Sequence, residues 1–130
     1  MNTREIGQLG ERLTCEYLVN NGYNILGKNH RINFGEIDII AKKKWRPFRK
    51  NDKTIHFIEV KTIVSEKDFF PEEKVDSKKQ RKLRKLAQIW LNANGFKENF
   101  PYQIDIAGIV INERKRVARM HYFKNDVGDF

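Results

Sequence analysis

Gly35-Glu36-Ile37-Asp38-Ile39-Ile40 and Phe57-Ile58-Glu59-Val60-Lys61-Thr62 are the two stretches that decide the fold of this chain. Both are rich in β-branched residues and favour strands, on which side chains point to alternating faces. Glu36 and Asp38 are therefore predicted to share one face of the first strand, and Glu59 and Lys61 one face of the second. If the two strands pair, Asp38, Glu59 and Lys61 converge.

Two carboxylates and an ammonium on one rigid platform suit metal-assisted hydrolysis of a phosphodiester. The acids bind a hard divalent cation, and the lysine stabilises developing negative charge or orients the attacking water. The alternative is a set of ion pairs on the solvated face of an antiparallel sheet. We favour the site, because Ile55 and Phe57 share the face of Glu59, and Ile40 that of Asp38, and charges among apolar groups carry a desolvation cost. The opposite face is expected to enter a core through Ile37, Ile39 and Val60.

Size and charge limit the class of protein. The 130 residues predict a single domain over residues 1–130. Lysine and arginine number 26 against 17 acids, a net charge of +9 that favours a polyanionic partner, although a basic protein can lack one. The single cysteine, Cys15, excludes an intramolecular disulfide and fits a reducing cytoplasm. No apolar run approaches spanning length, so we expect a cytoplasmic protein without membrane insertion.

The N-terminal segment, residues 3–21, has the pattern of an amphipathic helix, with an apolar stripe of Ile6, Leu9, Leu13 and Tyr17. Gly7 and Gly10 lie beside the stripe and lower helix stability, so each is predicted to allow close approach of another backbone. Glu11 has two readings. A lone helix glutamate is most often solvated, but it could be a third acid leaning toward Asp38 and Glu59.

A basic loop, residues 42–53, is predicted to join the two acid-bearing strands as a hairpin with Trp45 and Phe48 at its tip. A solvated loop is the simpler reading. The aromatics beside Arg46 and Arg49 favour nucleic acid, because bases stack on aromatic rings while cations neutralise phosphates.

A second helix is predicted from Ser77, as the start of a capping box, to about Asn94. Its first turns carry many cations, among them Lys78, Lys79 and Lys82. Positive charge at a helix N-terminus opposes the macrodipole, which points to bound phosphate. Gln80 is either the capping side chain or a residue facing the metal site.

The remaining strands are predicted at residues 23–33, 102–112 and 116–123. Asp105 lies within an apolar run, so it is either paired or near the site, and we favour pairing. His30, His56 and His121 share no ligand spacing and are predicted to be ordinary surface or edge residues.

The order helix, three strands, helix, strand resembles the PD-(D/E)XK nuclease fold, and nearly the whole chain resembles the bacterial UPF0102 (YraN-like) family. The resemblance rests on Gly7-x-x-Gly10-Glu11 with Tyr17-Leu18, Gly22-Tyr23-x-Ile25-Leu26-x-x-Asn29-x-Arg31, residues 35–41, residues 57–62, Pro71, Val75, Lys79-Gln80 and Asp105. It implies an α/β fold with a restriction endonuclease-like αβββαβ core, a mixed central sheet flanked by two main helices, related to archaeal Holliday-junction resolvases.

The resemblance also implies roles. Glu11, Asp38 and Glu59 would bind Mg²⁺ or Mn²⁺, Lys61 would be the catalytic lysine, and Lys79 with Gln80 would contact substrate or site. The chain departs from the family where two usual arginines are replaced by Ile63 and Gln103, and where the hairpin loop is longer and more basic. The lost arginines put phosphate or ion-pair contacts in question, and the loop would supply replacement cations.

Three functions follow from these observations. The leading hypothesis is a metal-dependent DNA endonuclease that selects DNA by shape, since no motif for reading base sequence is apparent. The second is a nucleic-acid-binding module without catalysis. The third is a structural or interaction protein, such as a homodimer, whose basic loop docks an acidic partner.

Overall fold

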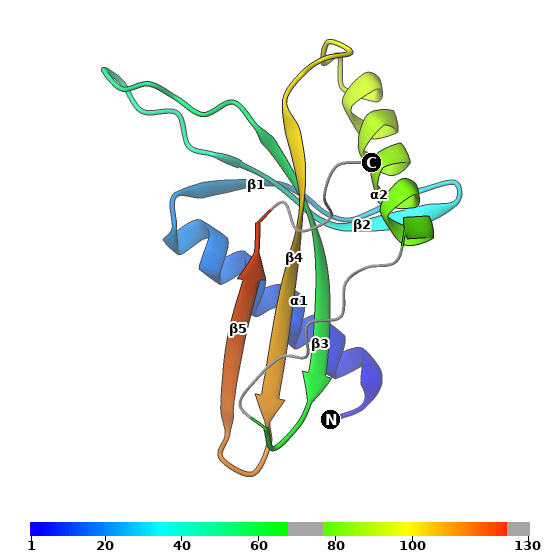
Figure 1. The fold of residues 1–130 in the computed structure, drawn as a ribbon. Helices are drawn as coiled ribbons and strands as arrows, with labels where there is room; N and C mark the ends of the chain where they lie inside the picture. The colour runs from blue at the N-terminus through cyan, green and yellow to red at the C-terminus, as the bar shows by residue number, and fades with distance from the viewer. Residues whose placement is uncertain (68–76, 125–130) are drawn as a thin grey trace.

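Within residues 1–67 and 77–124, which the computed structural model describes, five strands form one sheet in sequence order (Figure 1). The strands are β1 (Tyr23–Ile32), β2 (Gly35–Lys43), β3 (Ile55–Val64), β4 (Tyr102–Asn112) and β5 (Val117–Phe123). The helices are α1 (Thr3–Asn20) and α2 (Ser77–Ala93). Each predicted helix and strand is present. β2 and β3 extend beyond the quoted stretches 35–40 and 57–62, by three residues and by two residues at each end, and the other bounds differ by no more than one residue from the predicted ones.

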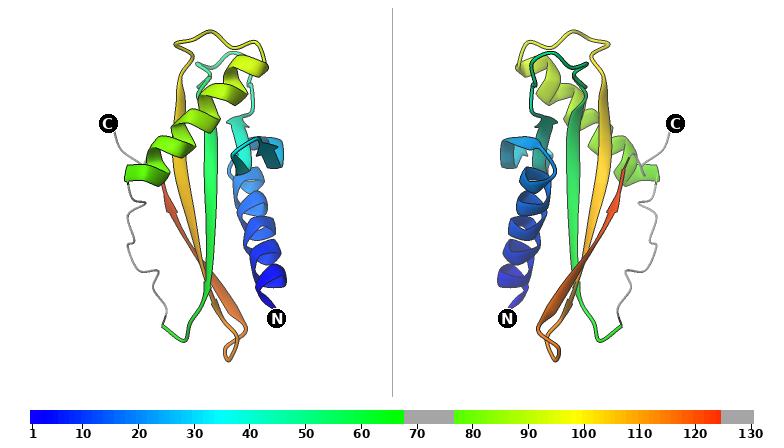
Figure 2. Two further views of the ribbon diagram at one scale, coloured as in Figure 1. Left: turned by 90° about the vertical axis from the view of Figure 1, so that its right-hand side faces the viewer. Right: turned by 90° about the vertical axis from the view of Figure 1, so that its left-hand side faces the viewer.

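The sheet is mixed. β1 with β2, β2 with β3, and β4 with β5 are antiparallel, whereas β3 and β4 are parallel and joined by a crossover that contains α2. The two helices cover opposite faces of the sheet (Figure 2). The predicted α/β fold, with the αβββαβ order and a mixed sheet flanked by two helices, is therefore confirmed.

Each face of the sheet has its own apolar core. The core between α2 and the sheet includes Ile37, Ile40 and Phe57 of the sheet with Leu83 and Leu86 of the helix. The core between α1 and the sheet consists of Cys15, Leu18, Tyr23, Ile39, Ala41, Ile58 and Ala107, with Val60 packed against them. The prediction that Ile37 and Ile39 share a face is wrong, because the alternation breaks between them at Asp38, beside an irregularity in β1.

That irregularity lies at Asn29, whose φ of 47° is left-handed. The β1–β2 register pairs Lys28 with Ile39 and His30 with Ile37, on either side of Asn29 and Asp38. The pairing stays in step across Asn29 and Asp38, and the register shift between these two strands lies between Ile25 and Gly27. Ile37 nevertheless belongs to the core on the α2 side of the sheet and Ile39 to the core on the α1 side.

Close packing of α1 on the sheet depends on Gly10. A Cβ at this position would overlap the Thr62 hydroxyl of β3, so the expected close approach is confirmed, although the neighbour is a side chain. A Cβ at Gly7 would have nothing within 4 Å, so the same prediction for Gly7 is wrong.

Some predictions concern the segment between β3 and α2. Pro71 and Val75 lie outside the described residues, as does the residue that precedes α2. Ser77 already belongs to the helix that it was predicted to cap. Across the described ranges, neither helix has the length and apolar character needed to cross a bilayer.

Candidate active site

Asp38 lies where the β2–β3 ladder stops. The paired residues end at Ile39 and Ile58, and continuing the register would have joined Asp38 to Glu59 and then Ile37 to Val60. Instead, the Val60 N–H donates to Asp38 Oδ2 at 2.8 Å. A backbone donor left without an acceptor would be costly, so the carboxylate completes the end of the ladder and is held against β3.

The surroundings of Asp38 disfavour its charge. Burial raises the pKa of this carboxyl to about 7, and the neighbouring carboxylates of Glu59, Glu11 and Glu36 act in the same direction, against the hydrogen bond from Val60. Asp38 is thus a partly buried acid on which three other carboxylates act in the same unfavourable direction. A cation there would relieve the repulsion and let Asp38 ionise.

Glu11 reaches this region from α1, and its partly buried carboxyl acts on Asp38 electrostatically. Burial raises the pKa of Glu11, a hydrogen bond with the Asn29 side chain lowers it, and Glu36 raises it further. The reading of Glu11 as an acid near the sheet site thus has electrostatic support. Glu36 also forms an ion pair with Arg31 at 3.8 Å.

Glu59 and Lys61 stand two residues apart on β3, on the side that faces α2. Lys79 Nζ of α2 lies 2.9 Å from Glu59 Oε1, so this glutamate has a cation as a neighbour. Lys61 is exposed. Gln80, the residue after Lys79, is buried in the first turns of α2.

The donor set suits a hard divalent cation, although the ligands are not assembled as the structure stands. Among residues 1–67 and 77–124, no group of three or more histidines, cysteines and acids is arranged to hold a metal ion. Mg²⁺ needs less, because it commonly binds one or two carboxylates and takes its other ligands from water and substrate phosphate. Asp38 and Glu59 would be those two acids, with Glu11 as a further candidate.

A basic groove of about 680 Å³ runs along the start of α2, and we use this name for the hollow lined by Phe34, Lys78, Lys79, Arg81, Lys82 and Lys85. Lys79 joins the groove to the acidic site through its ion pair with Glu59. Phe34 was not among the residues predicted to take part. It is 44% exposed in the β1–β2 turn, and its ring lies 5.8 Å from Lys85 Nζ. An aromatic residue in a tight Asn-Phe-Gly turn was the signal that could have identified it.

A second basic region is the hairpin arm, the name used here for residues 44–54 between β2 and β3. It extends away from the sheet (Figure 1), and it carries Trp45 and Phe48 fully open to solvent or nearly so. A hollow at its base is lined in part by Arg46 and Arg49. The arm starts about 20 Å from Asp38, because Lys44 lies six residue steps of about 3.4 Å along the strand from Asp38.

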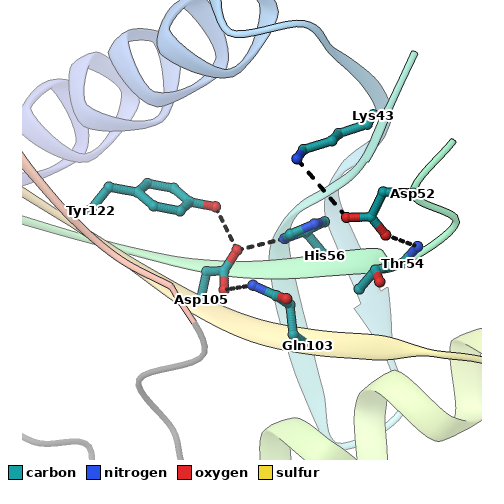
Figure 3. Close-up of polar contacts among 7 residues, drawn as sticks. All are labelled: Lys43, Asp52, Thr54, His56, Gln103, Asp105 and Tyr122. Atoms are coloured by element: carbon teal, nitrogen blue, oxygen red, sulfur yellow. Dashed lines mark hydrogen bonds and ion pairs between the residues drawn. The ribbon is translucent and has the colours of Figure 1, made fainter. Parts of the chain in front are cut away.

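Asp105 is a buried acid with a structural role. It accepts hydrogen bonds from Tyr122 at 2.7 Å and Gln103 at 2.8 Å, and it contacts His56 Nδ1 at 2.8 Å (Figure 3). The predicted pairing of Asp105 is confirmed. Gln103, at a position where an arginine is usual in the resembled family, supplies one of the donors. The prediction that His56 is an ordinary surface or edge residue is wrong, since it is 3% exposed and held by Asp105.

Comparison with known proteins places the chain in a family. The model of a family described as "Uncharacterised protein family UPF0102" matches residues 10–109. A UPF0102 protein of Caldicellulosiruptor bescii is 37% identical over 125 residues, which cover 96% of this chain and 98% of the relative. Another from Dictyoglomus turgidum is 38% identical and covers 96% and 98%, and one from Thermodesulfovibrio yellowstonii is 42% identical and covers 85% and 88%.

Among solved structures, Pyrococcus furiosus SfsA in complex with Ca²⁺ aligns with 95% of this chain, at 14% identity and a TM-score of 0.39. The chain spans 64% of the length of that protein. The family match covers most of the sequence, and the relatives match it almost end to end. The chain belongs to the UPF0102 family.

Proposed function

We propose that this chain is an endonuclease that uses Mg²⁺ or Mn²⁺ to hydrolyse phosphodiester bonds in DNA, as a member of the PD-(D/E)XK group that it resembles. The observation that carries the proposal is the partly buried Asp38, held at the end of the β2–β3 ladder with its pKa raised to about 7, in part by three other acids. Such a concentration of acids is unfavourable without a cation, and perturbed carboxyls of this kind mark functional sites.

Each residue of the site has a role under this proposal. Asp38 and Glu59 would hold the divalent ion, and Glu11 of α1 would add negative charge near it. When bound, the ion would activate a water molecule and neutralise charge at the scissile phosphate. Lys61, beside Glu59 on β3, stabilises negative charge that develops on the phosphate or orients the water. When DNA binds, the Lys79 side chain would leave Glu59 and contact a phosphate.

The basic groove supplies the surface for the DNA backbone. Its five cations lie along one side of α2, and Lys79 connects them to the acids. Contacts of this kind position a duplex without reading its sequence, so selectivity would come from DNA shape, as expected for an enzyme that resembles Holliday-junction resolvases.

A nicking and cleavage assay tests the proposal on plasmid, flap and four-way-junction DNA with Mg²⁺ or Mn²⁺. Asp38→Asn is the sharpest variant, because the amide oxygen still accepts from Val60 while the charge is lost. Glu59→Gln is its companion, and Glu113→Gln in the exposed β4–β5 turn is the matched control. The proposal predicts cleavage by wild type and by the control only. Cleavage that survives both site substitutions would overturn it.

One observation favours a second function, a nucleic-acid-binding module without catalysis. Lys79 already neutralises Glu59, and a fixed ion pair leaves no need for a metal there. This reading predicts salt-sensitive DNA binding without turnover, with an affinity that Asp38→Asn leaves unchanged in the presence or absence of Mg²⁺.

A further inference from the structure

The hairpin arm exposes two large aromatic side chains close together in the sequence. Trp45 is 71% exposed and Phe48 106% exposed. Isolated apolar residues on a surface are common, but two aromatic rings on one projecting loop, surrounded by cations, form a distinct surface. Exposed rings among cations can stack against a partner that has flat aromatic groups and negative charge.

The loop that carries these rings is held in one shape by its own hydrogen bonds. The Asn51 side chain accepts from the Arg46 N–H at 2.8 Å, and it donates to the carbonyl oxygens of Arg46 and Arg49 at 3.0 Å each. The Lys44 N–H donates to the Gly22 carbonyl at 2.9 Å, which ties the base of the arm to the α1–β1 turn. The aromatic rings are therefore presented on an ordered loop, which reduces the entropy lost on binding.

Phe48 itself adopts a left-handed conformation, with a φ of 59°. This conformation is unfavourable for a bulky residue, and such strain persists only where the surrounding structure imposes it. The result is a ring that points fully into solvent rather than folding back onto the protein.

Positive charge surrounds the rings. A hollow of about 290 Å³ at the base of the arm is lined by Lys43, Lys44, Arg46, Arg49 and Lys50, together with Asn21, Gly22, Asn51 and Asp52. Asp52 is the one acid of this lining, and it lies 3.9 Å from Lys43 Nζ. Trp45 and Phe48 do not line the hollow, but each is next in the chain to a lining cation, Trp45 to Lys44 and Arg46 and Phe48 to Arg49.

We infer that the hairpin arm binds unpaired nucleotides, with bases stacked on Trp45 and Phe48 and phosphates in the hollow beside them. The inference deepens the proposed nuclease function, on which it rests, by naming the feature of the substrate that the arm selects. Bases of an intact duplex stack on each other and do not offer their faces, whereas those of a single strand do. The basic groove would hold duplex, and the arm an unpaired strand about 20 Å from Asp38, as estimated from strand rise.

Tryptophan fluorescence gives a direct test, because the chain has two tryptophans and the other, Trp90, is 8% exposed within the core. The titration uses the full chain in EDTA, where no metal-dependent hydrolysis occurs. An oligothymidylate should quench the Trp45 emission, and its duplex with oligoadenylate should quench it far less. Because substitution of Trp45 removes the fluorophore, the variants are compared with wild type by the fluorescence anisotropy of a dye-labelled oligothymidylate. Trp45→Ala and Phe48→Ala should each weaken single-strand binding about tenfold, the effect expected for loss of one stacked base, and change duplex binding less than about twofold.

Two controls separate stacking from charge and from misfolding. Trp45→Phe keeps a flat ring and should retain most of the affinity, and Val117→Ala removes an exposed apolar side chain outside the arm and the basic groove and should leave single-strand binding unchanged. Inorganic polyphosphate, which has charge but no bases, should compete poorly. Three results would overturn the inference. Polyphosphate could bind as tightly as the single strand, as expected of a surface for an acidic partner. Both alanine variants could keep wild-type affinity, or the chain could bind no single strand at low salt.

The outcome is independent of the nuclease test. If wild type cleaves DNA but the Trp45→Ala variant still binds single strands normally, the inference is overturned and the proposed function stands. Loss of single-strand binding in that variant, together with no cleavage by wild type, would support the arm and refute the nuclease.

Discussion

Replacing Asp38 by asparagine should stabilise the metal-free protein above neutral pH, although it removes a residue of the proposed active site. The folded structure disfavours the charged carboxylate, chiefly through burial and then through Glu59, Glu11 and Glu36. An asparagine has no charge to bury, and its amide oxygen still accepts from the Val60 N–H. The variant thus isolates the electrostatic cost from the loss of the hydrogen bond.

The size of the effect follows from the pKa of this carboxyl, which rises from 3.8 to about 7 on folding. At about 1.36 kcal/mol for each pH unit, the ionised Asp38 costs the folded state roughly 4 kcal/mol at pH 8. The sign is fixed by linkage: a raised carboxyl pKa gives stability that is present below pH 3.8 and is lost as the pH rises toward 7. The advantage of the variant should therefore be small near pH 4 and greatest above pH 7.

Thermal or urea unfolding of wild type and Asp38→Asn in EDTA, from pH 4 to pH 8, measures this difference. For a chain of this size, roughly 4 kcal/mol corresponds to a rise in Tm of about 10 °C or more at pH 8. Added Mg²⁺ or Mn²⁺ should stabilise wild type and leave the variant unchanged. A variant that is less stable than wild type at pH 8, or a difference that does not change with pH, would refute the reasoning.

Three further predictions concern packing and charge. Gly10→Ala should destabilise the protein by about 1–3 kcal/mol in urea unfolding, because the added methyl overlaps the Thr62 side chain of β3. Gly7→Ala is its matched control and should stabilise the protein by about 0.5–1 kcal/mol. Equal effects of the two substitutions would contradict the packing. Asp105→Ala should cost about 3–5 kcal/mol, since the buried His56 and the partly buried Gln103 and Tyr122 lose their partner, and a loss below about 1 kcal/mol would contradict the network. Lys79→Met should weaken duplex DNA binding severalfold and lower the slope of its salt dependence by about one. It should also raise the affinity for a divalent ion at Glu59, because the competing ammonium is removed. Unchanged binding of DNA and of the ion would argue against the link between the groove and the acidic site.

The fold could be read from local pattern because its strongest signals are local. Runs of β-branched residues predicted β2 and β3, apolar stripes predicted α1 and α2, and the placement of one helix between the third and fourth strands agreed with the parallel β3–β4 pair. The side of the sheet that Ile37 occupies could not be read in this way, since alternation assumes an unbroken ladder. The change of face falls at Asp38, opposite the left-handed Asn29 of β1.

Features that depend on distant residues were beyond the sequence pattern. His56 meets Asp105, 49 positions away, and nothing near His56 in the sequence indicates that contact. Gly7 and Gly10 look alike in sequence, and only the position of β3 distinguishes them. The Lys79–Glu59 ion pair requires α2 to lie across β3, which is a result of packing between elements.

Titration of the metal-free chain with Mn²⁺ at pH 6 to 8, without nucleic acid, tests most directly whether the acids around Asp38 form a cation site. One ion should bind per chain, with release of a proton near pH 6 because Asp38 must ionise, and Asp38→Asn and Glu59→Gln should each weaken it by about tenfold or more. The account is contradicted if wild type binds no ion, or if both variants bind as tightly as wild type.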